Sequence, residues 1–270
     1  MIFKRFRRKR KIGLALGGGA TKGTSIFAII EELEKLNLKI SFISGTSVGA
    51  IIGAYYALYG EVSTLKAEIL SFSKSDWIRF VDFNRMPKKS LIKGKKYKKF
   101  LEEKFGDKKF SNTKIPLVIS VTNLITGKIE YIEKGKIVDA VIASSAFPGI
   151  FPPIKKEGDI YVDGGVLNNL PYEILIEKGL SKIIAINLFN WHKRTKINNL
   201  FDVIVSSIEL MSEKVFVGLE ENNKKLFILT PKFKKSIKSM WDFSDLYEKY
   251  DAGKIEFNLK RNKLLRWLKS

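Results

Sequence analysis

The sequence predicts an α/β fold, because strand-like and helix-like stretches alternate along the chain. Hydrophobic residues make up 45% of the 270 residues, which is enough to bury a sizeable core. No internal repeat and no long Pro/Gly/Ser linker interrupts the alternation. A single domain is therefore the simplest account of the chain.

The amino-terminal part is predicted to begin with two strand–helix pairs. Residues 12–16 form the first strand, and isoleucine and leucine recur at helical spacing over residues 24–36. A short strand over residues 40–43 leads into a helix over residues 48–59, which is apolar nearly all round and is expected to be central. Residues 61–110 are more polar and are expected to be helical.

The rest of the chain continues the alternation. Pro116 precedes a strong strand, "LVISVTNL", and the turn at Thr126–Lys128 predicts a hairpin partner, "IEYIEK". The other predicted elements are a helix over 137–144, a strand end in "IYVDGG", a helix in "YEILIEKG", a buried strand in "KIIAINLF", a helix over 201–219, a strand in "KLFILTP" and a terminal helix.

The chain is strongly basic, with 49 Lys and Arg against 28 Asp and Glu and a formal charge of +21. This balance favours contact with nucleic acid or acidic lipid, although a lysine-rich solvated surface explains much of the excess. Basic residues gather at 4–11, at 88–99 and in the carboxy-terminal "LKRNKLLRWLKS". In the last segment Leu264, Leu265, Trp267 and Leu268 alternate with basic residues, as in an interfacial helix.

Composition also bears on the compartment. The chain has no cysteine, which excludes disulfides and thiolate metal sites. No apolar segment is long enough to span a bilayer. The basic start, "MIFKRFRRKRK", runs into a glycine-broken stretch and is expected to belong to the fold rather than to a removable leader. We therefore expect a cytoplasmic protein, with a peripheral position at the inner membrane face.

The first chemical motif is "GTSVG", residues 45–49, which fits the nucleophile-elbow pattern G-x-S-x-G. A strand is predicted before it and a helix after it, so the turn exposes the Ser47 side chain. Gly45 and Gly49 let neighbouring backbone pass close by. The alternative is a serine that merely caps a buried helix.

The second motif is "LGGGATKG", residues 16–23, which also follows a strand and opens a helix. It fails as a phosphate-binding loop, because the order is Lys22-Gly23-Thr24, and as a dinucleotide fingerprint, because Lys22 stands where glycine is needed. What remains is a run of backbone N–H groups at a helix N-terminus, which is an anion site. In a serine hydrolase that anion is the oxyanion of a tetrahedral intermediate.

The third motif is "YVDGGVLNNLP", in which Asp163 ends a strand before Gly164 and Gly165. An ordinary Asp-Gly turn is the alternative interpretation. The chain has one histidine, His192, in a polar stretch after a strand. A carboxylate within hydrogen-bond reach can accept the serine proton instead, and partial burial raises its basicity. The sequence thus predicts a Ser47–Asp163 dyad.

Several stretches together resemble the patatin-like phospholipase family. The glycine-rich "LALGGGATKGTSIFAIIEEL" is similar to its oxyanion segment, and "ISGTSVGAIIGAYYA" to its nucleophile elbow and following helix. "PLVISVTNLITGK" resembles its central strand, and "ASSAFPGIFPPI" with "YVDGGVLNNLPYEIL" resembles the segment that contains the catalytic Asp-Gly-Gly. The resemblance covers about residues 11–258.

The resemblance implies a three-layer α/β/α sandwich with a central, mostly parallel sheet and no metal or cofactor. It implies Ser47 as the nucleophile, Asp163 as the base, and the amides of Gly18, Gly19 and Ala20 as the oxyanion hole. Where the family usually has a third glycine this chain has Ala20, and a positive φ there costs roughly 1–2 kcal/mol. The supporting motif residues are Gly17, Lys22, Gly23, Gly45, Gly49, Gly164 and Gly165.

We accordingly expect a basic tail over 1–11, a patatin-like domain over 12–258 and a basic amphipathic extension over 259–270. The expected activity is hydrolysis of a phospholipid or another acyl-ester lipid, at an anionic membrane surface reached through the basic tails, with no nucleic acid as partner. Lys22 is expected to orient the glycine-rich loop or to face a substrate phosphate.

Two alternatives stay open. One is a membrane- or nucleic-acid-binding protein without turnover, whose marker, loss of a dyad residue, is not seen here. The other is an α/β-hydrolase-type esterase that uses Ser47, Asp163 and His192 in that order.

Overall fold

The computed structural model describes residues 11–73, 82–84, 90–189, 197, 202–204, 206–207, 210–211, 223–233, 243 and 245–270. Three sequence-based expectations lie wholly or largely outside these residues: the position of His192, the basic tail before residue 11, and the helix over 201–219.

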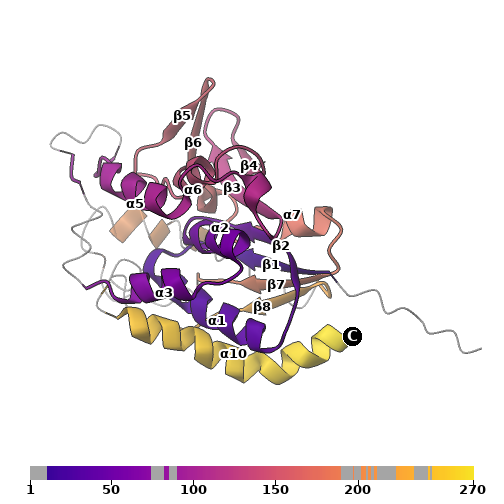
Figure 1. Ribbon diagram of the computed structural model, residues 1–270. Helices are drawn as coiled ribbons and strands as arrows, with labels where there is room; N and C mark the ends of the chain where they lie inside the picture. The colour runs from indigo at the N-terminus through magenta and orange to yellow at the C-terminus, as the bar shows by residue number, and fades with distance from the viewer. Residues whose placement is uncertain are drawn as a thin grey trace, which may run out of the picture.

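Within the described residues the core is a mixed eight-stranded sheet (Figure 1) in the order β5-β6-β3-β2-β1-β7-β8, with β4 antiparallel to β3. The strands are β1 (Ile12–Leu16), β2 (Ile40–Gly45), β3 (Leu117–Asn123), β4 (Lys128–Ile132), β5 (Ile154–Lys156), β6 (Asp159–Asp163), β7 (Lys182–Ile186) and β8 (Leu226–Leu229). Neighbouring strands from β3 through β2, β1 and β7 to β8 are parallel, whereas β4, β5 and β6 join antiparallel. The predicted α/β class is therefore confirmed.

Helices flank both faces of this sheet. They are α1 (Thr24–Lys35), α2 (Val48–Tyr59), α3 (Ser63–Leu70), α5 (Lys95–Phe105), α6 (Ile137–Ser144), α7 (Glu173–Glu177) and α10 (Leu246–Lys269), with short 3-10 turns η1 (Ala20–Gly23), η2 (Phe110–Asn112) and η3 (Gly164–Val166). Helices α1, α2, α6 and α10 pack into one large apolar cluster, and α7 packs into a second cluster across the sheet. This arrangement gives three layers.

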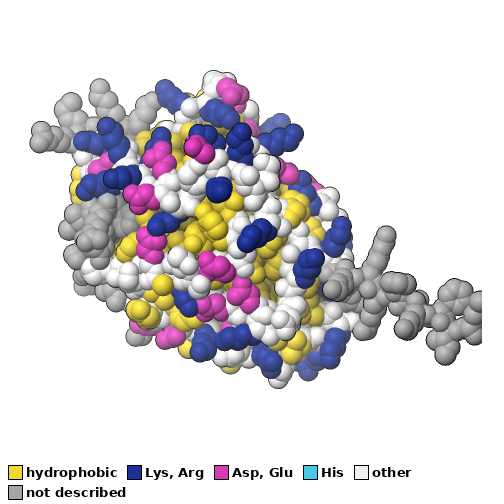
Figure 2. All heavy atoms as spheres, in the orientation of Figure 1, with side chains coloured by type: hydrophobic (Ala, Val, Ile, Leu, Met, Phe, Trp, Pro, Cys, Tyr) yellow, Lys and Arg dark blue, Asp and Glu magenta, His cyan; other side chains and the backbone are white. Residues whose placement is uncertain are grey.

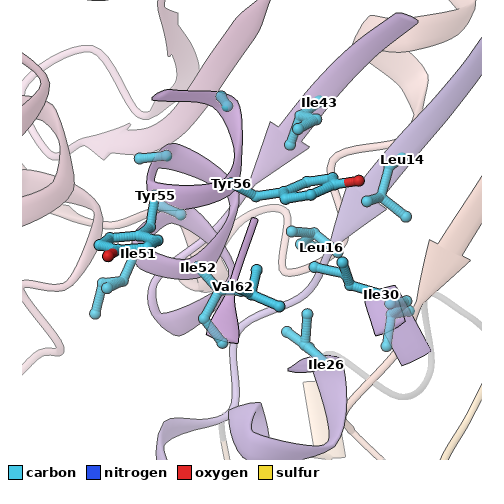
Figure 3. Packing of buried hydrophobic residues seen from close by; sticks show 14 of the residues in the cluster. Leu14, Leu16, Ile26, Ile30, Ile43, Ile51, Ile52, Tyr55, Tyr56 and Val62 are labelled. Carbon is cyan, nitrogen blue, oxygen red and sulfur yellow. The ribbon is translucent and has the colours of Figure 1, made fainter. Parts of the chain in front are cut away.

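Alternate side chains along β1 pack against the helices on opposite faces of the sheet. Leu14 and Leu16 belong to the large cluster, whereas Ala15 belongs to the cluster on the opposite face. Both faces are buried, as is typical of parallel strands. Figure 3 shows the large cluster, in which Tyr56 points from α2 towards Leu14 and Ile43. The all-round apolar sequence of α2 is thus explained by its central position.

Helix α10 contains the expected boundary between the domain and the carboxy-terminal extension. The boundary between 258 and 259 falls inside this 24-residue helix, which packs along α1. Leu264 is fully buried, and the Trp267 ring lies 5.4 Å from the ring of Phe227. Leu264 and Trp267 therefore pack against the domain, whereas Ile255 and Leu259 on the same helix are exposed. No helix among the described residues has the length and apolar character needed to cross a bilayer.

Candidate active site

The nucleophile elbow is a tight turn between β2 and α2. The Thr46 amide donates to the Leu16 carbonyl at 3.0 Å, and the Gly49 amide donates to the Thr46 carbonyl at 2.8 Å. Ser47 precedes α2 with φ 54° and ψ −122°. A serine in this sparsely populated region costs of the order of 1–3 kcal/mol. Such strain, held by the surrounding bonds, is what a turn that presents a side chain to a reactant is expected to show.

Glycine is needed in the motifs because backbone segments approach closely. A β-carbon at Gly49 would lie 2.3 Å from the Leu16 carbonyl oxygen, and one at Gly164 would lie 2.5 Å from the Ser120 carbonyl oxygen. A β-carbon would come within 3.0 Å of a neighbouring atom at Gly17, Gly23, Gly45 and Gly165 as well. At Gly49 and Gly164 the clash is with backbone, so a side chain there would displace the elbow or the Asp-Gly-Gly turn.

The strand register brings Asp163 to the elbow. Gly45, the last residue of β2, pairs with Ile119 of β3. Two residues further along β3, Val121 pairs with Asp163 on the antiparallel strand β6. Ser47 likewise lies two residues beyond Gly45. Asp163, at the end of β6, and Ser47 are therefore at the same height along β3. The two side chains that the sequence separates by more than a hundred residues meet at one edge of the sheet.

Asp163 is 3% exposed and carries two hydrogen bonds. The Gly165 amide donates to its Oδ1 at 2.8 Å, and the Ser47 side chain is its other hydrogen-bond partner. Burial raises the pKa of the Asp163 carboxyl to about 7, although both hydrogen bonds lower it. A carboxylate that is half-protonated near neutral pH and bonded to a hydroxyl is suited to act as a proton acceptor.

The glycine-rich loop passes over the same edge. The Gly18 amide donates to the Asn169 carbonyl at 3.2 Å, so it already has an acceptor. The amides of Gly19 and Ala20 have no acceptor among the residues that the structure describes. Gly18 and Gly19 line a small cavity of about 10 Å³ together with Ser47 and Asp163. Of the three amides expected to form the oxyanion hole, those of Gly19 and Ala20 thus lack an acceptor among the described residues.

Two neighbours on this loop bear on the sequence-based expectations. Ala20 has φ 47°, so the residue that replaces the family's third glycine does adopt a left-handed conformation. The Lys22 side chain is buried, with Nζ 5.8 Å from the centre of the Phe189 ring and 5.6 Å from that of Phe233. Lys22 is therefore buried against two aromatic rings.

An apolar cavity of about 140 Å³ opens at Ser47. Its wall is formed by side chains from several helices and loops, most of them aliphatic or aromatic, among them Val48, Ile51, Leu65, Phe100, Phe147 and Phe151. Ser47 and Phe147 line this cavity and the small one around Asp163 alike, so the two adjoin. The space suits a hydrocarbon chain. No group of three or more His, Asp or Glu able to hold a metal ion occurs in the described part of the chain.

Sequence reasoning missed two residues that fix the site. The Ser144 hydroxyl, at the end of α6, accepts the Ser47 amide at 2.9 Å. Asn169 holds Gly18 on both sides, because its carbonyl accepts the Gly18 amide and its Nδ2 donates to the Gly18 carbonyl, each at 3.2 Å. Both residues stand in stretches that resemble the family, but only the folded chain reveals these partners.

Replacing Asn169 with alanine is expected to lower kcat about 10–100-fold and to leave KM within about threefold, since the loop loses one of the two bonds that position its amides. Steady-state kinetics on a nitrophenyl ester will measure both constants. The neighbouring Asn168 is the matched control, because its side chain bonds Tyr131 and Glu173 instead. A raised KM with unchanged kcat would contradict a positioning role for Asn169.

Comparisons with known proteins found a family model, curated relatives and solved structures that are similar to this chain. A family model described as patatin-like phospholipase matches residues 14–176. A lysophospholipase NTE1 of Debaryomyces hansenii is 31% identical over 196 residues, and one of Candida albicans is 29% identical over 201 residues. The matches cover 72% and 73% of this chain but only 13% and 14% of those relatives. The crystal structure of VipD from Legionella pneumophila has a TM-score of 0.49 at 13% identity, covering 93% of this chain and 67% of that one.

Proposed function

Because the chain belongs to the patatin-like phospholipase family, we propose that it hydrolyses an acyl ester bond of a lipid, with Ser47 as nucleophile and Asp163 as general base. One observation carries the proposal: the Ser47 side chain is hydrogen-bonded to a buried carboxylate, at the mouth of an apolar cavity. Nucleophile and base within hydrogen-bond reach are the signature of covalent catalysis.

In the acylation step, the ionised Asp163 accepts the proton of the Ser47 hydroxyl while Oγ attacks the acyl carbonyl carbon. The negative charge that develops on the carbonyl oxygen is met by the amides of Gly19 and Ala20 and by the N-terminus of α2. The bond to the alcohol oxygen then breaks, and that oxygen takes the proton from Asp163. An acyl group is left on Ser47, with its hydrocarbon chain in the apolar cavity.

Deacylation repeats these roles with water. Asp163 accepts a proton from the attacking water, the second tetrahedral intermediate uses the same amides, and Ser47 takes the proton back as the fatty acid leaves. A base with a pKa near the working pH serves both directions of transfer. Loss of one oxyanion donor typically costs about 10²–10³ in rate, so the strained Ala20 affects efficiency rather than mechanism.

The substrate class follows from the cavity and from the relatives named lysophospholipases. We expect fatty acid release when the purified chain is incubated with mixed monoacyl and diacyl phospholipids and the products are quantified by mass spectrometry. The same preparation is assayed on a short-chain nitrophenyl ester. Cleavage of the nitrophenyl ester with no release from any lipid would reject lipid hydrolysis and leave a plain esterase.

We also propose that the basic surface holds the protein at anionic membranes. The formal charge is +21, and each basic residue near an anionic leaflet contributes about 1 kcal/mol. Figure 2 shows Lys and Arg side chains spread over the visible face and interspersed with acidic ones. The proposal therefore rests on electrostatic attraction. The test presents the same phospholipids in vesicles with and without an anionic lipid. Fatty acid release is expected to be faster from the anionic vesicles, and equal rates of release would exclude electrostatic docking.

A further inference from the structure

Two strands meet end to end beside Ser120, along one edge of β3. Strand β4 covers the opposite edge, where it pairs with β3 at Ile119 and again at Val121. On the edge that remains, Ile119 pairs with Gly45, the last residue of β2. On that same edge Val121 pairs with Asp163, the last residue of β6. The parallel strand that leads to the elbow and the antiparallel strand that carries the carboxylate therefore end on either side of a single residue.

Two buried hydroxyls span this junction. Strands β2 and β6 each pair with β3 and not with each other. Thr46, the elbow residue before the nucleophile, and Ser120 are fully buried, and their hydroxyl oxygens lie 2.5 Å apart. The Thr46 hydroxyl donates to the Asn168 carbonyl at 3.1 Å, in the turn that follows Asp163. A hydroxyl has one hydrogen, so Ser120 is the donor of the bond that it shares with Thr46.

Ser120 also touches both strand ends directly. Its hydroxyl oxygen lies 3.4 Å from the Gly45 carbonyl oxygen. A β-carbon at Gly164 would lie 2.5 Å from the carbonyl oxygen and from the hydroxyl oxygen of Ser120, so the Asp-Gly-Gly turn packs closely on this residue. A movement of either strand end changes the distance between the nucleophile and the carboxylate. Misplacing a reacting group by about 1 Å can cost about 10²-fold in rate.

We propose that Thr46 and Ser120 are positioning residues, which hold the Ser47 hydroxyl within hydrogen-bond reach of the Asp163 carboxylate. Neither residue lines the apolar cavity or the small cavity around Asp163, so both act through the dyad and not on the substrate. A buried polar network whose members are all bonded favours one arrangement of the groups that it joins. The inference rests on the proposed function and deepens it, because it names what keeps nucleophile and base together.

The experiment compares Thr46→Val, which replaces the hydroxyl by a methyl group, with Thr46→Ser, which keeps the hydroxyl. We expect Thr46→Val to lower kcat on a nitrophenyl ester about 10–100-fold with KM within about threefold, and Thr46→Ser to stay within about threefold of the wild type in both constants. Ser120→Ala breaks the same bond with a smaller change in the core and is expected to lower kcat similarly. The double variant Thr46→Val/Ser120→Ala is expected to lose no more than about threefold beyond the weaker single variant, because the two changes remove one shared bond.

The pH profile distinguishes positioning from a general loss of structure. Burial raises the pKa of the Asp163 carboxyl, and the bonds from the Gly165 amide and the Ser47 side chain lower it. Tyr97, the titratable side chain that interacts with this carboxylate from α5, stays protonated because burial raises its pKa. A weaker bond from Ser47 therefore moves the inflection of kcat/KM in both variants to higher pH, by about 0.5–1 pH unit. A lower kcat with an unchanged inflection would overturn the proposal.

Ser44→Ala is the matched control. Ser44 is a fully buried residue on the same strand as the elbow, but its hydroxyl donates to the Pro171 carbonyl at 2.6 Å, before α7. Its variant loses a buried hydrogen bond of the same kind and is expected to keep kcat within about threefold, with the wild-type inflection. Full activity in Thr46→Val, or an equal loss in Ser44→Ala, would overturn the positioning role while wild-type turnover upholds the hydrolase. A wild-type protein that turns over no ester would overturn both.

Discussion

Replacing Ser47 with alanine is expected to lower kcat/KM for a short-chain nitrophenyl ester by roughly 10⁴-fold or more, because a hydrolase that loses its nucleophile keeps only the contribution of binding and of the oxyanion donors. The serine lies at the one point where the strained elbow, the Asp163 carboxylate and the apolar cavity meet. No other described hydroxyl has that set of neighbours.

Ser41→Ala is the control for this prediction, because Ser41 lies on the same strand, β2, and lines neither cavity at the elbow. It is expected to turn over the ester within about twofold of the wild type. Both variants are compared at equal protein concentration after thermal unfolding has shown them to be folded. Equal turnover by Ser47→Ala and the wild type would remove Ser47 from the mechanism.

Replacing Asp163 with asparagine is expected to lower kcat/KM about 10²–10⁴-fold, the usual contribution of a general base. The wild-type pH profile provides a second sign of the same role. Burial raises the pKa of Asp163 to about 7, and the base must be ionised, so kcat/KM is expected to rise with pH and to level off above about pH 7. Activity at pH 5 is expected to be about 100-fold below the plateau. A flat profile between pH 5 and pH 8 would contradict this assignment.

The same substitution is expected to stabilise the protein at alkaline pH. The folded-state pKa of Asp163 is raised from its ordinary value of 3.8 to about 7, so between about pH 4 and pH 7 the folded chain keeps a proton that the unfolded chain loses. The free energy of unfolding therefore falls as pH rises through this window, by about 1.4 kcal/mol per pKa unit. Asparagine removes the buried charge and can keep both hydrogen bonds. Asp163→Asn should unfold at a higher temperature than the wild type at pH 8. Below pH 4 the two proteins should unfold at similar temperatures.

Much of the architecture is predictable because it rests on local patterns. The bounds of β1, α2 and α6 agree with the predicted residues 12–16, 48–59 and 137–144. Their sequences are short apolar runs bounded by glycine or polar residues, so period and composition suffice. Strand β5 was not predicted, because "IKK" is three residues long and two of them are exposed lysines at the sheet edge.

The candidate site is only partly predictable, and the reason is register. The motifs name Ser47 and Asp163, but their meeting depends on β3 pairing with β2 at Ile119 and with β6 at Val121. No local pattern specifies these pairings. The bonds of Asn169 to Gly18 and of Ser144 to Ser47 are likewise contacts between distant loops. For helix α10 the sequence pattern was ambiguous. Apolar residues on one face of a helix can pack against a membrane or against the protein's own core, and Leu264 packs into the core.

The central claim is that a carboxylate alone activates Ser47, and comparing Asp163→Asn with His192→Ala on the same nitrophenyl ester tests it most directly. The account predicts that His192→Ala retains kcat/KM within about threefold of the wild type while Asp163→Asn loses at least about 10². Loss of activity in His192→Ala of the size expected for a general base would contradict the dyad and establish the histidine as the group that takes the serine proton.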